Sequence, residues 1–187
     1  MVTKVYGDTG VDKVKNNTIT TANLPSGSVL QVQSVLYSTG DTYAMQADTH
    51  NTITNFSVSI TPRSASSKIL LMGRLFYEPS QGGWNDQTFY FTSNLTTRVN
   101  CPAAAGSRNV GMCMPMIGYW GDDRNTTPTM INISTVDSPN TTSTLTYWFG
   151  TQPDAAGTLY INRTLQDGDN TYSERGTSEI IAMEIAG

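Results

Sequence analysis

The chain has 187 residues, of which 14% are charged and 37% hydrophobic, and its formal net charge at pH 7 is −4. It contains no run of Lys and Arg interleaved with aromatic residues, which disfavours binding to nucleic acid because phosphate backbones are bound by clustered cations. No apolar stretch reaches the roughly 18 residues that a membrane-spanning helix needs. We therefore expect neither nucleic acid nor an inserted membrane among its partners.

Length and composition favour one domain built from strands. A chain of this length buries roughly 70% of the surface of its unfolded form, which is enough for one core. Thr is abundant and its β-branched side chain suits half-buried strands, whereas the abundant Asn, Ser, Gly and Pro suit turns. The sequence predicts an all-β domain with an uncharged polar surface.

Residues 1–28 differ from the rest because they are polar and carry few large apolar groups. Such a segment cannot form a core alone, so we predict an extended N-terminal arm that anchors residues 29–187, the head, to another copy or to a larger assembly. The candidate assembly residues in the arm are Val2, Val5, Tyr6, Val11 and Val14. The arm lacks the apolar core of a signal peptide, so we expect synthesis in a cytoplasm without export by the ordinary secretory route.

From Val29 onward, apolar runs of strand length alternate with turn-forming residues. About nine strands are predicted, at residues 29–37, 56–60, 68–78, 89–99, 110–119, 130–136, 145–151, 158–165 and 179–185. Residues 68–78 are apolar on both faces, which indicates a central strand between two layers. Trp148 lies within another apolar segment and is expected in the core. No segment has the pattern of an amphipathic helix. Strands spaced in this way predict an antiparallel β-sandwich that is jelly-roll-like.

Two connections, residues 79–87 and 121–129, are longer than hairpin turns, and loops of this kind often carry recognition. Sugar sites pair an exposed aromatic ring with Asp, Asn or Arg, and the chain has both ingredients in and beside these loops. The alternative is that Trp84 and Trp120 pack over the edge of the sandwich or in a subunit interface. The candidate receptor or glycan contacts are Trp84, Asn85, Asp86, Tyr119, Trp120, Asp122 and Arg124.

Three methionines, Met112, Met114 and Met116, recur at period two and would share one face of a strand. Core packing and a subunit interface explain this pattern equally well. Two cysteines, Cys101 and Cys113, are too few to staple a domain of this size, so in a protein made in a cytoplasm we expect two buried free thiols rather than a disulfide between them.

The sequence gives little support for a catalytic, metal or cofactor site. His50 is the only histidine and has no recognisable nucleophile near it in the sequence. The Asp167–Asn170 stretch could offer oxygen ligands to calcium, but its residue types are equally typical of a turn. A hydrolase with two carboxylates could pair Glu78 with Asp86 or Asp122 with Glu174, although nothing in the spacing selects them. We therefore expect no enzyme activity, no metal and no cofactor.

Three stretches carry a resemblance to a known family. They are VLQVQSVLYSTG from Val29 with its lead-in TTANLPSG, NFSVSITPRSASSKILLMGRLFYE ending at Glu78, and TSEIIAMEIAG at the last residues. Together they resemble the carboxy-terminal head domains of bacteriophage tail-fibre and related virion proteins, especially those of marine and cyanobacterial phages. The resemblance implies a homotrimeric β-sandwich on a virion surface, made in the host bacterial cytoplasm, whose loops contact a host glycan or protein.

Only about 28 residues precede the head, whereas tail fibres usually carry a long shaft. This departure makes a short fibre or knob, or a capsid decoration protein that stabilises the shell through its arm, alternatives to a fibre head. A lectin-like carbohydrate-binding module that acts without a virion is a further alternative.

Overall fold

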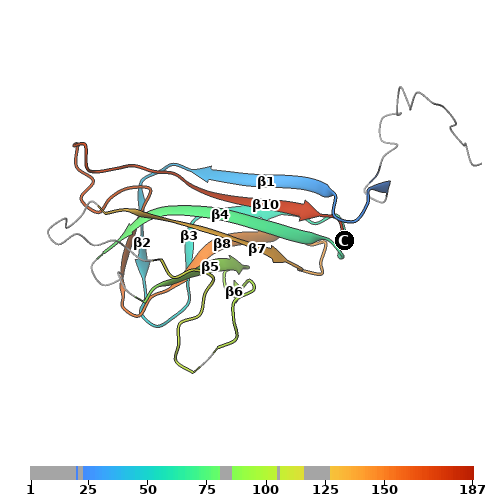
Figure 1. Ribbon diagram of the computed structural model, residues 1–187, viewed down its shortest axis with the longest axis horizontal. Coiled ribbons are helices and arrows are strands. Elements are labelled where there is room, and N and C mark those ends of the chain that lie inside the picture. Colours follow the sequence, from blue (N-terminus) through green and yellow to red (C-terminus); the bar gives the residue numbers. More distant parts are fainter. Residues whose placement is uncertain (1–19, 21–22, 81–85, 105, 116–126) are drawn as a thin grey trace, which may run out of the picture.

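The computed structural model describes residues 20, 23–80, 86–104, 106–115 and 127–187. Within these ranges the protein contains ten strands and no α-helix, so the all-β prediction is confirmed (Figure 1). None of the described residues belongs to a helix that is long and apolar enough to cross a membrane.

The ten strands form two antiparallel sheets. In chain order they are β1 (Val29–Tyr37), β2 (Asp41–Met45), β3 (Asn51–Ile60), β4 (Lys68–Pro79), β5 (Thr88–Ser93), β6 (Thr97–Arg98), β7 (Thr129–Asp137), β8 (Leu145–Gln152), β9 (Gly157–Ile161) and β10 (Ser178–Ile185). One sheet has six strands in the order β1-β10-β4-β9-β2, with β7 also paired to β4. The other has four strands in the order β3-β8-β5-β6.

The pairing of the strands is nested. β1 pairs with β10, β3 with β8, β4 with β7, and β5 with β6, so the first strand joins the last and the innermost pair is a hairpin. A chain folded in this way is one long antiparallel ribbon rolled into two facing sheets, which is the jelly-roll arrangement. β2 and β9 form an additional pair that continues the six-stranded sheet past the end of β4. The predicted jelly-roll-like sandwich is therefore confirmed.

The core lies between the two sheets and follows from the alternation of side chains along each strand. In β4, Ile69, Leu71, Leu75 and Tyr77 are fully buried, and aromatic residues of β5 and β8 face them from the opposite sheet. The sheets approach closely at Gly73, where an added Cβ would lie 2.6 Å from a ring carbon of Phe149. The absence of a side chain at residue 73 lets the aromatic rings of the other sheet occupy that space.

Several boundaries differ from the sequence expectations. The predicted strand 89–99 is two strands, because Asn94 and Leu95 both have positive φ and form a turn. β2 was not predicted, and β3 begins at Asn51 rather than at Phe56. The predicted strand 158–165 ends at Ile161, because Asn162 takes a φ of 59°.

Two expectations about the second half of the chain are wrong. Residues 110–115, the described part of the predicted strand 110–119, form no strand and contribute one isolated bridge, from Cys113 to Phe89. Trp148 is not in the core, because its neighbours Tyr147 and Phe149 point inward and Trp148 lies half-buried on the outer face of β8. In β8, alternation along the strand decides burial more strongly than residue size does.

β4 is central within its sheet, as predicted, with β10 and β9 along one edge and β7 along the other. Its outer face is only partly covered by the described residues, however. Leu70, Met72 and Phe76 on that face are only partly buried. Among the described residues, the apolar pattern on that face therefore does not reflect a second buried layer.

Most of the predicted arm, including Val2, Val5, Tyr6, Val11 and Val14, lies outside the described residues. The described lead-in is attached to the end of β10. The amide of Gly27 donates to the carbonyl of Ala186 (2.8 Å), and the amide of Ala186 donates to the carbonyl of Ser28 (2.8 Å). The first and last parts of the head are thus joined by backbone hydrogen bonds.

Candidate functional site

A polar hollow of about 640 Å³ opens among the loops beside β6 and the end of β8. Its lining includes side chains of both signs and several hydroxyl and amide groups: Asp48, Arg98, Ser107, Arg108, Asn109 and Gln152. Asp48 takes a φ of 52° in the turn before β3, and Arg98 ends β6. The fold therefore brings together polar residues that are up to about a hundred positions apart.

The side chain of Arg98 is held in this hollow by three contacts. Its Nη1 donates to the carbonyl of Val110 (2.9 Å) and its Nη2 donates to Oε1 of Gln152 (2.5 Å). The guanidinium carbon lies 4.5 Å from the ring centroid of Tyr90, an arrangement in which the ring face attracts the cation. Arg108 is exposed at the rim. Hydroxyl-rich ligands suit such a mixture of donors and acceptors.

The described end of the predicted recognition loop 79–87, at Asp86, adjoins the hollow. Asp86 is its described candidate residue; it is exposed, has a φ of 58°, and its carbonyl accepts a hydrogen bond from Nδ2 of Asn109 (3.2 Å). The other candidate contacts lie outside the described residues: Trp84, Asn85, Tyr119, Trp120, Asp122 and Arg124. Sequence reasoning selected the aromatic residues and missed Arg98 and Arg108, because nothing in the chain indicates that residues 98–110 fold back beside Gln152.

The methionine and cysteine predictions have mixed outcomes. Met112 is partly buried and packs against the core, Met114 is 64% exposed, and Met116 lies outside the described residues. The two described methionines therefore do not share one face, and their role in an interface stays a prediction. Cys101 and Cys113 are free, as expected, but they are only partly buried, and this burial raises the pKa of both thiols.

His50 is held by structural contacts. Its Nδ1 lies 3.0 Å from the hydroxyl of Tyr90, and its Nε2 lies 2.9 Å from Oγ1 of Thr52 and 2.9 Å from the carbonyl of Leu95. Thr52 also donates to the carbonyl of Leu95. These contacts fasten the turn between β5 and β6 to the start of β3.

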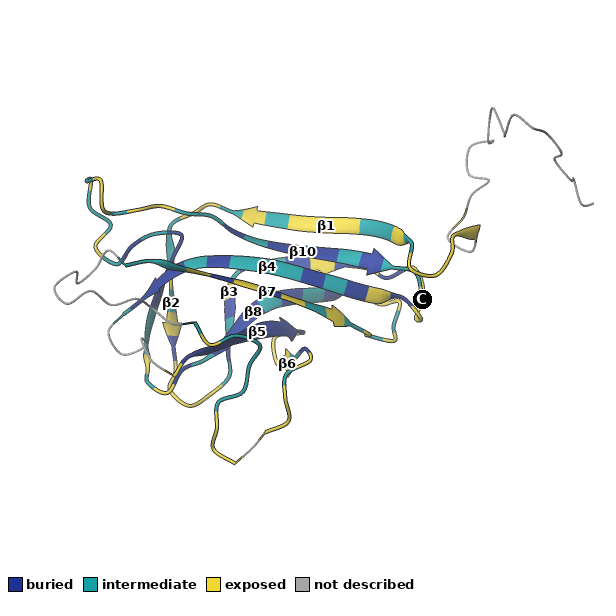
Figure 2. Ribbon diagram, viewed as in Figure 1, coloured by how far each residue is buried: buried dark blue, intermediate teal, exposed yellow. Residues whose placement is uncertain are grey.

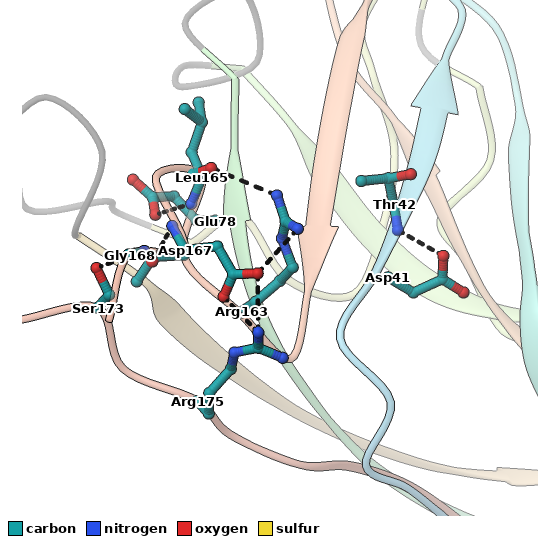
Figure 3. A network of polar contacts seen from close by, with 10 residues as sticks. Asp41, Thr42, Glu78, Arg163, Leu165, Asp167, Gly168, Ser173 and Arg175 are labelled. Atoms are coloured by element: carbon teal, nitrogen blue, oxygen red, sulfur yellow. Dashed lines mark hydrogen bonds and ion pairs between the residues drawn. The ribbon is translucent and has the colours of Figure 1, made fainter. Parts of the chain in front are cut away.

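A charged cluster organises the loop that follows β9 (Figure 3). Asp167 accepts from Nη1 of Arg163 (3.1 Å) and lies 2.7 Å from Nη2 of Arg175, so two guanidinium groups surround its carboxylate. Its backbone amide donates to Oγ1 of Thr164 (3.1 Å), and the amide of Gly168 donates to Oγ of Ser173 (3.1 Å). The Asp167–Asn170 stretch is thus a turn closed by ion pairs, and the two nearby cations oppose the binding of calcium at Asp167.

Glu78, a candidate acid of the hydrolase alternative, has a structural position. It is 4% exposed, and its carboxylate accepts from the backbone amides of Leu165 (2.7 Å) and Thr127 (3.3 Å). A carboxylate engaged by amides from two different loops holds those loops on the end of β4. Its predicted partner Asp86 is exposed on the surface, whereas Asp122 lies outside the described residues and Glu174 is exposed.

Asp41 joins the two sheets through a second polar cluster. The hydroxyl of Tyr37 and Nδ2 of Asn55 donate to its Oδ2, at 2.6 Å and 2.5 Å. The hydrogen bond from Tyr37 is the largest cause that holds the pKa of Asp41 below its ordinary value. Burial, together with the Asp41 carboxylate, raises the pKa of Tyr37 to about 12. The pair therefore favours a protonated phenol beside an ionised carboxylate across the neutral range.

No family model and no curated protein matches the chain. Among solved structures, VP2 of the infectious bursal disease virus subviral particle is similar, with a TM-score of 0.37 and 13% identity over 95% of this chain and 42% of that one. The chain thus spans less than half the length of VP2. A likeness of this size carries no argument about function.

Proposed function

We propose that this chain is a non-enzymatic structural protein of a bacteriophage virion, a homotrimeric short fibre, knob or fibre head displayed on the particle surface. The observation that carries the proposal is where the family-like stretches lie in the fold. The first and last stretches become β1 and β10, and residues 68–78 of the middle stretch become β4, so that these strands are neighbours in the order β1-β10-β4. Residues 56–60 of the middle stretch belong to β3 in the facing sheet, which contacts β1 and β10. Stretches that are distant in sequence are thus close together in the fold, as expected if the likeness reflects a common structural unit.

The fold is compatible with this role but does not select it. Jelly rolls occur in viral capsid proteins and also in lectin domains, and a fold alone does not identify a function. Within the proposal, residues 1–28 anchor the head to other virion proteins, and the loops around the polar hollow face outward toward a host glycan or protein. Arg98 and Asn109 then fix the shape of a recognition surface that takes part in no chemical reaction.

Mass spectrometry of density-purified particles tests the virion location. We expect peptides of this chain to remain with the particles through a gradient, and immunogold labelling to place them at the tail tip or at a fibre end. Uniform labelling of the shell would favour the decoration alternative. Absence of the chain from purified particles would refute a virion role.

Light scattering tests the trimer. Three copies of the 20.3 kDa chain give a mass of about 61 kDa. The mass of a chain that begins at Ser28 shows whether the trimer needs the arm. In the proposal the arm anchors the head, so a chain without it should no longer be bound to particles. A monomer that binds sugar with measurable affinity would instead support the lectin-like alternative.

A further inference from the structure

The outer faces of the two sheets differ in how far the chain itself covers them. In β5 all six residues are buried, including the outward-facing Tyr90, which contacts the ring of His50 and lies under the guanidinium of Arg98. Thr88 on the same face lies against Gly111. The outer face of the four-stranded sheet is therefore covered at β5 by loops of this chain.

The outer face of the six-stranded sheet is covered at one end, where Gly176 lies against the ring of Phe76. Toward the other end, no outward-facing residue of β1, β10, β4 or β7 is buried in the described part of the chain. β1 contains no buried residue and is the most exposed strand of its sheet (Figure 2). Five of the large hydrophobic residues that are exposed belong to this sheet: Val29, Val32, Leu36, Met130 and Val136. Their side chains are 44% to 60% exposed. Apolar side chains on strands normally point into the core, so a patch of exposed ones indicates a surface to which another molecule binds.

The register of the strands aligns these side chains in rows. Val32 lies opposite Met183, Met183 opposite Leu70, and Leu70 opposite Val136, so one wholly apolar row crosses four strands. The next row has Ile181 and Met72 at its centre, flanked by two serines. A shallow hollow of about 310 Å³ lies beside this second row, where the side chain of a partner could fit.

Charge on the face is low and balanced. Arg74 and Glu179 lie opposite each other in the third row, with Nε of Arg74 3.5 Å from Oε2 of Glu179. Lys68 lies at one end, opposite Ile185. Two faces of this composition can approach each other without repulsion between like charges, since the central charges already form a pair. Depletion of unpaired charge at the centre is typical of protein interfaces.

The size of the face suits a stable contact. Four strands spaced about 4.8 Å apart, with about eight residues each at about 3.3 Å, span roughly 500 Å². Two such faces together bury about 1,000 Å² if each is treated as flat, and protruding side chains add to this area. The flat area already reaches the lower bound for a specific interface. The polar arm, with few large apolar groups, offers less suitable cover than a second copy of the same face.

We propose that the outer face formed by β1, β10, β4 and β7 packs against the same face of a second copy of this chain. The inference deepens the proposed function by naming the surface through which the homo-oligomer forms. It does not depend on a virion location. In the proposed trimer the three copies turn this face toward the threefold axis, so the apolar rows lie at its centre.

The test replaces both ends of the apolar row, as Val32→Lys with Val136→Lys, in the full chain. The matched control is Leu95→Lys with Met114→Lys, which changes two residues that are 45% and 64% exposed and lie outside the face. Mass is measured by light scattering, and folding by circular dichroism. We expect the unaltered chain and the control to be oligomers and the double variant on the face to have the single-chain mass of 20.3 kDa with an unchanged spectrum.

Three results would overturn the inference. One is an unaltered chain that is monomeric at about 100 µM, because an interface that reaches the lower bound for specific contacts is expected to form at that concentration. Another is a folded face variant that keeps the mass of the oligomer. The third is a chain beginning at Ser28 that associates while the full chain does not, because the arm would then cover the face. If the lysine variant fails to fold, Val32→Thr with Val136→Thr is judged by the same criteria. Any of these results would refute the contact between copies but would leave the virion role to be decided by the particle experiment.

Discussion

Asn162 is the residue whose replacement most directly tests how the jelly roll is closed. It lies at the junction of β9 with the start of β10, is 1% exposed and has a φ of 59°. Its Nδ2 donates to the carbonyl oxygens of Tyr37 (2.9 Å) and Thr39 (3.2 Å), and its Oδ1 accepts from Oγ of Ser178 (2.7 Å). One side chain therefore connects the end of β1, the loop before β2 and the start of β10.

Asn162→Ala removes all three of these hydrogen bonds. At about 1 kcal/mol each, their loss costs about 3 kcal/mol, because two part-buried carbonyl groups and the buried hydroxyl of Ser178 lose this partner. Alanine also tolerates a positive φ less well than asparagine does, which adds up to about 1 kcal/mol. The expected decrease in the free energy of unfolding is therefore about 3–4 kcal/mol.

Asn140→Ala is the matched control. Asn140 also has a positive φ, 51°, but it is exposed and its side chain makes one hydrogen bond, from Nδ2 to the carbonyl of Ser138 (3.0 Å). The control carries the same backbone penalty, so we expect a cost of about 1 kcal/mol. Urea denaturation followed by tryptophan fluorescence measures both variants. Equal costs for the two variants would refute the reasoning, since burial of the three bonds would then contribute nothing.

Three further predictions follow from particular contacts. Gly73→Ala should destabilise the fold by about 1–3 kcal/mol through overlap with Phe149, and combination with Phe149→Leu should cost less than the sum of the two single changes; additive costs in denaturation would contradict this. Tyr37→Phe should cost about 1–2 kcal/mol near neutral pH. Because the pKa of Asp41 is lowered in the folded state, this cost should shrink as pH falls below about 4; a gap independent of pH would refute the linkage. Leu95→Gly should stabilise the turn by about 0.5–1 kcal/mol because the leucine has a φ of 68°, and a lower melting temperature would disprove this.

The candidate site was less predictable than the fold. Asp86 was predicted from its loop, yet Arg98, which fixes the neighbouring hollow, lies in a segment that had been assigned to one long strand. The turn at Asn94 and Leu95 was missed because leucine rarely adopts a positive φ, so that no turn-forming residue type follows Asn94. Local residue preferences gave no indication of contacts that the loops make only after the sheets have formed.

The sequence by itself determined the β class, the alternation that builds the core, and eight of the strands, because these depend on the period-two pattern of each segment. Only the tertiary structure decided which strands are neighbours and which face of each is covered. Leu71 and Met72 are equally apolar in sequence, yet the first is buried between the sheets and the second lies on an outer face. The difference arises because burial depends on what the rest of the chain places over a residue, and in the proposed oligomer it is another copy that covers the apolar rows beside Met72.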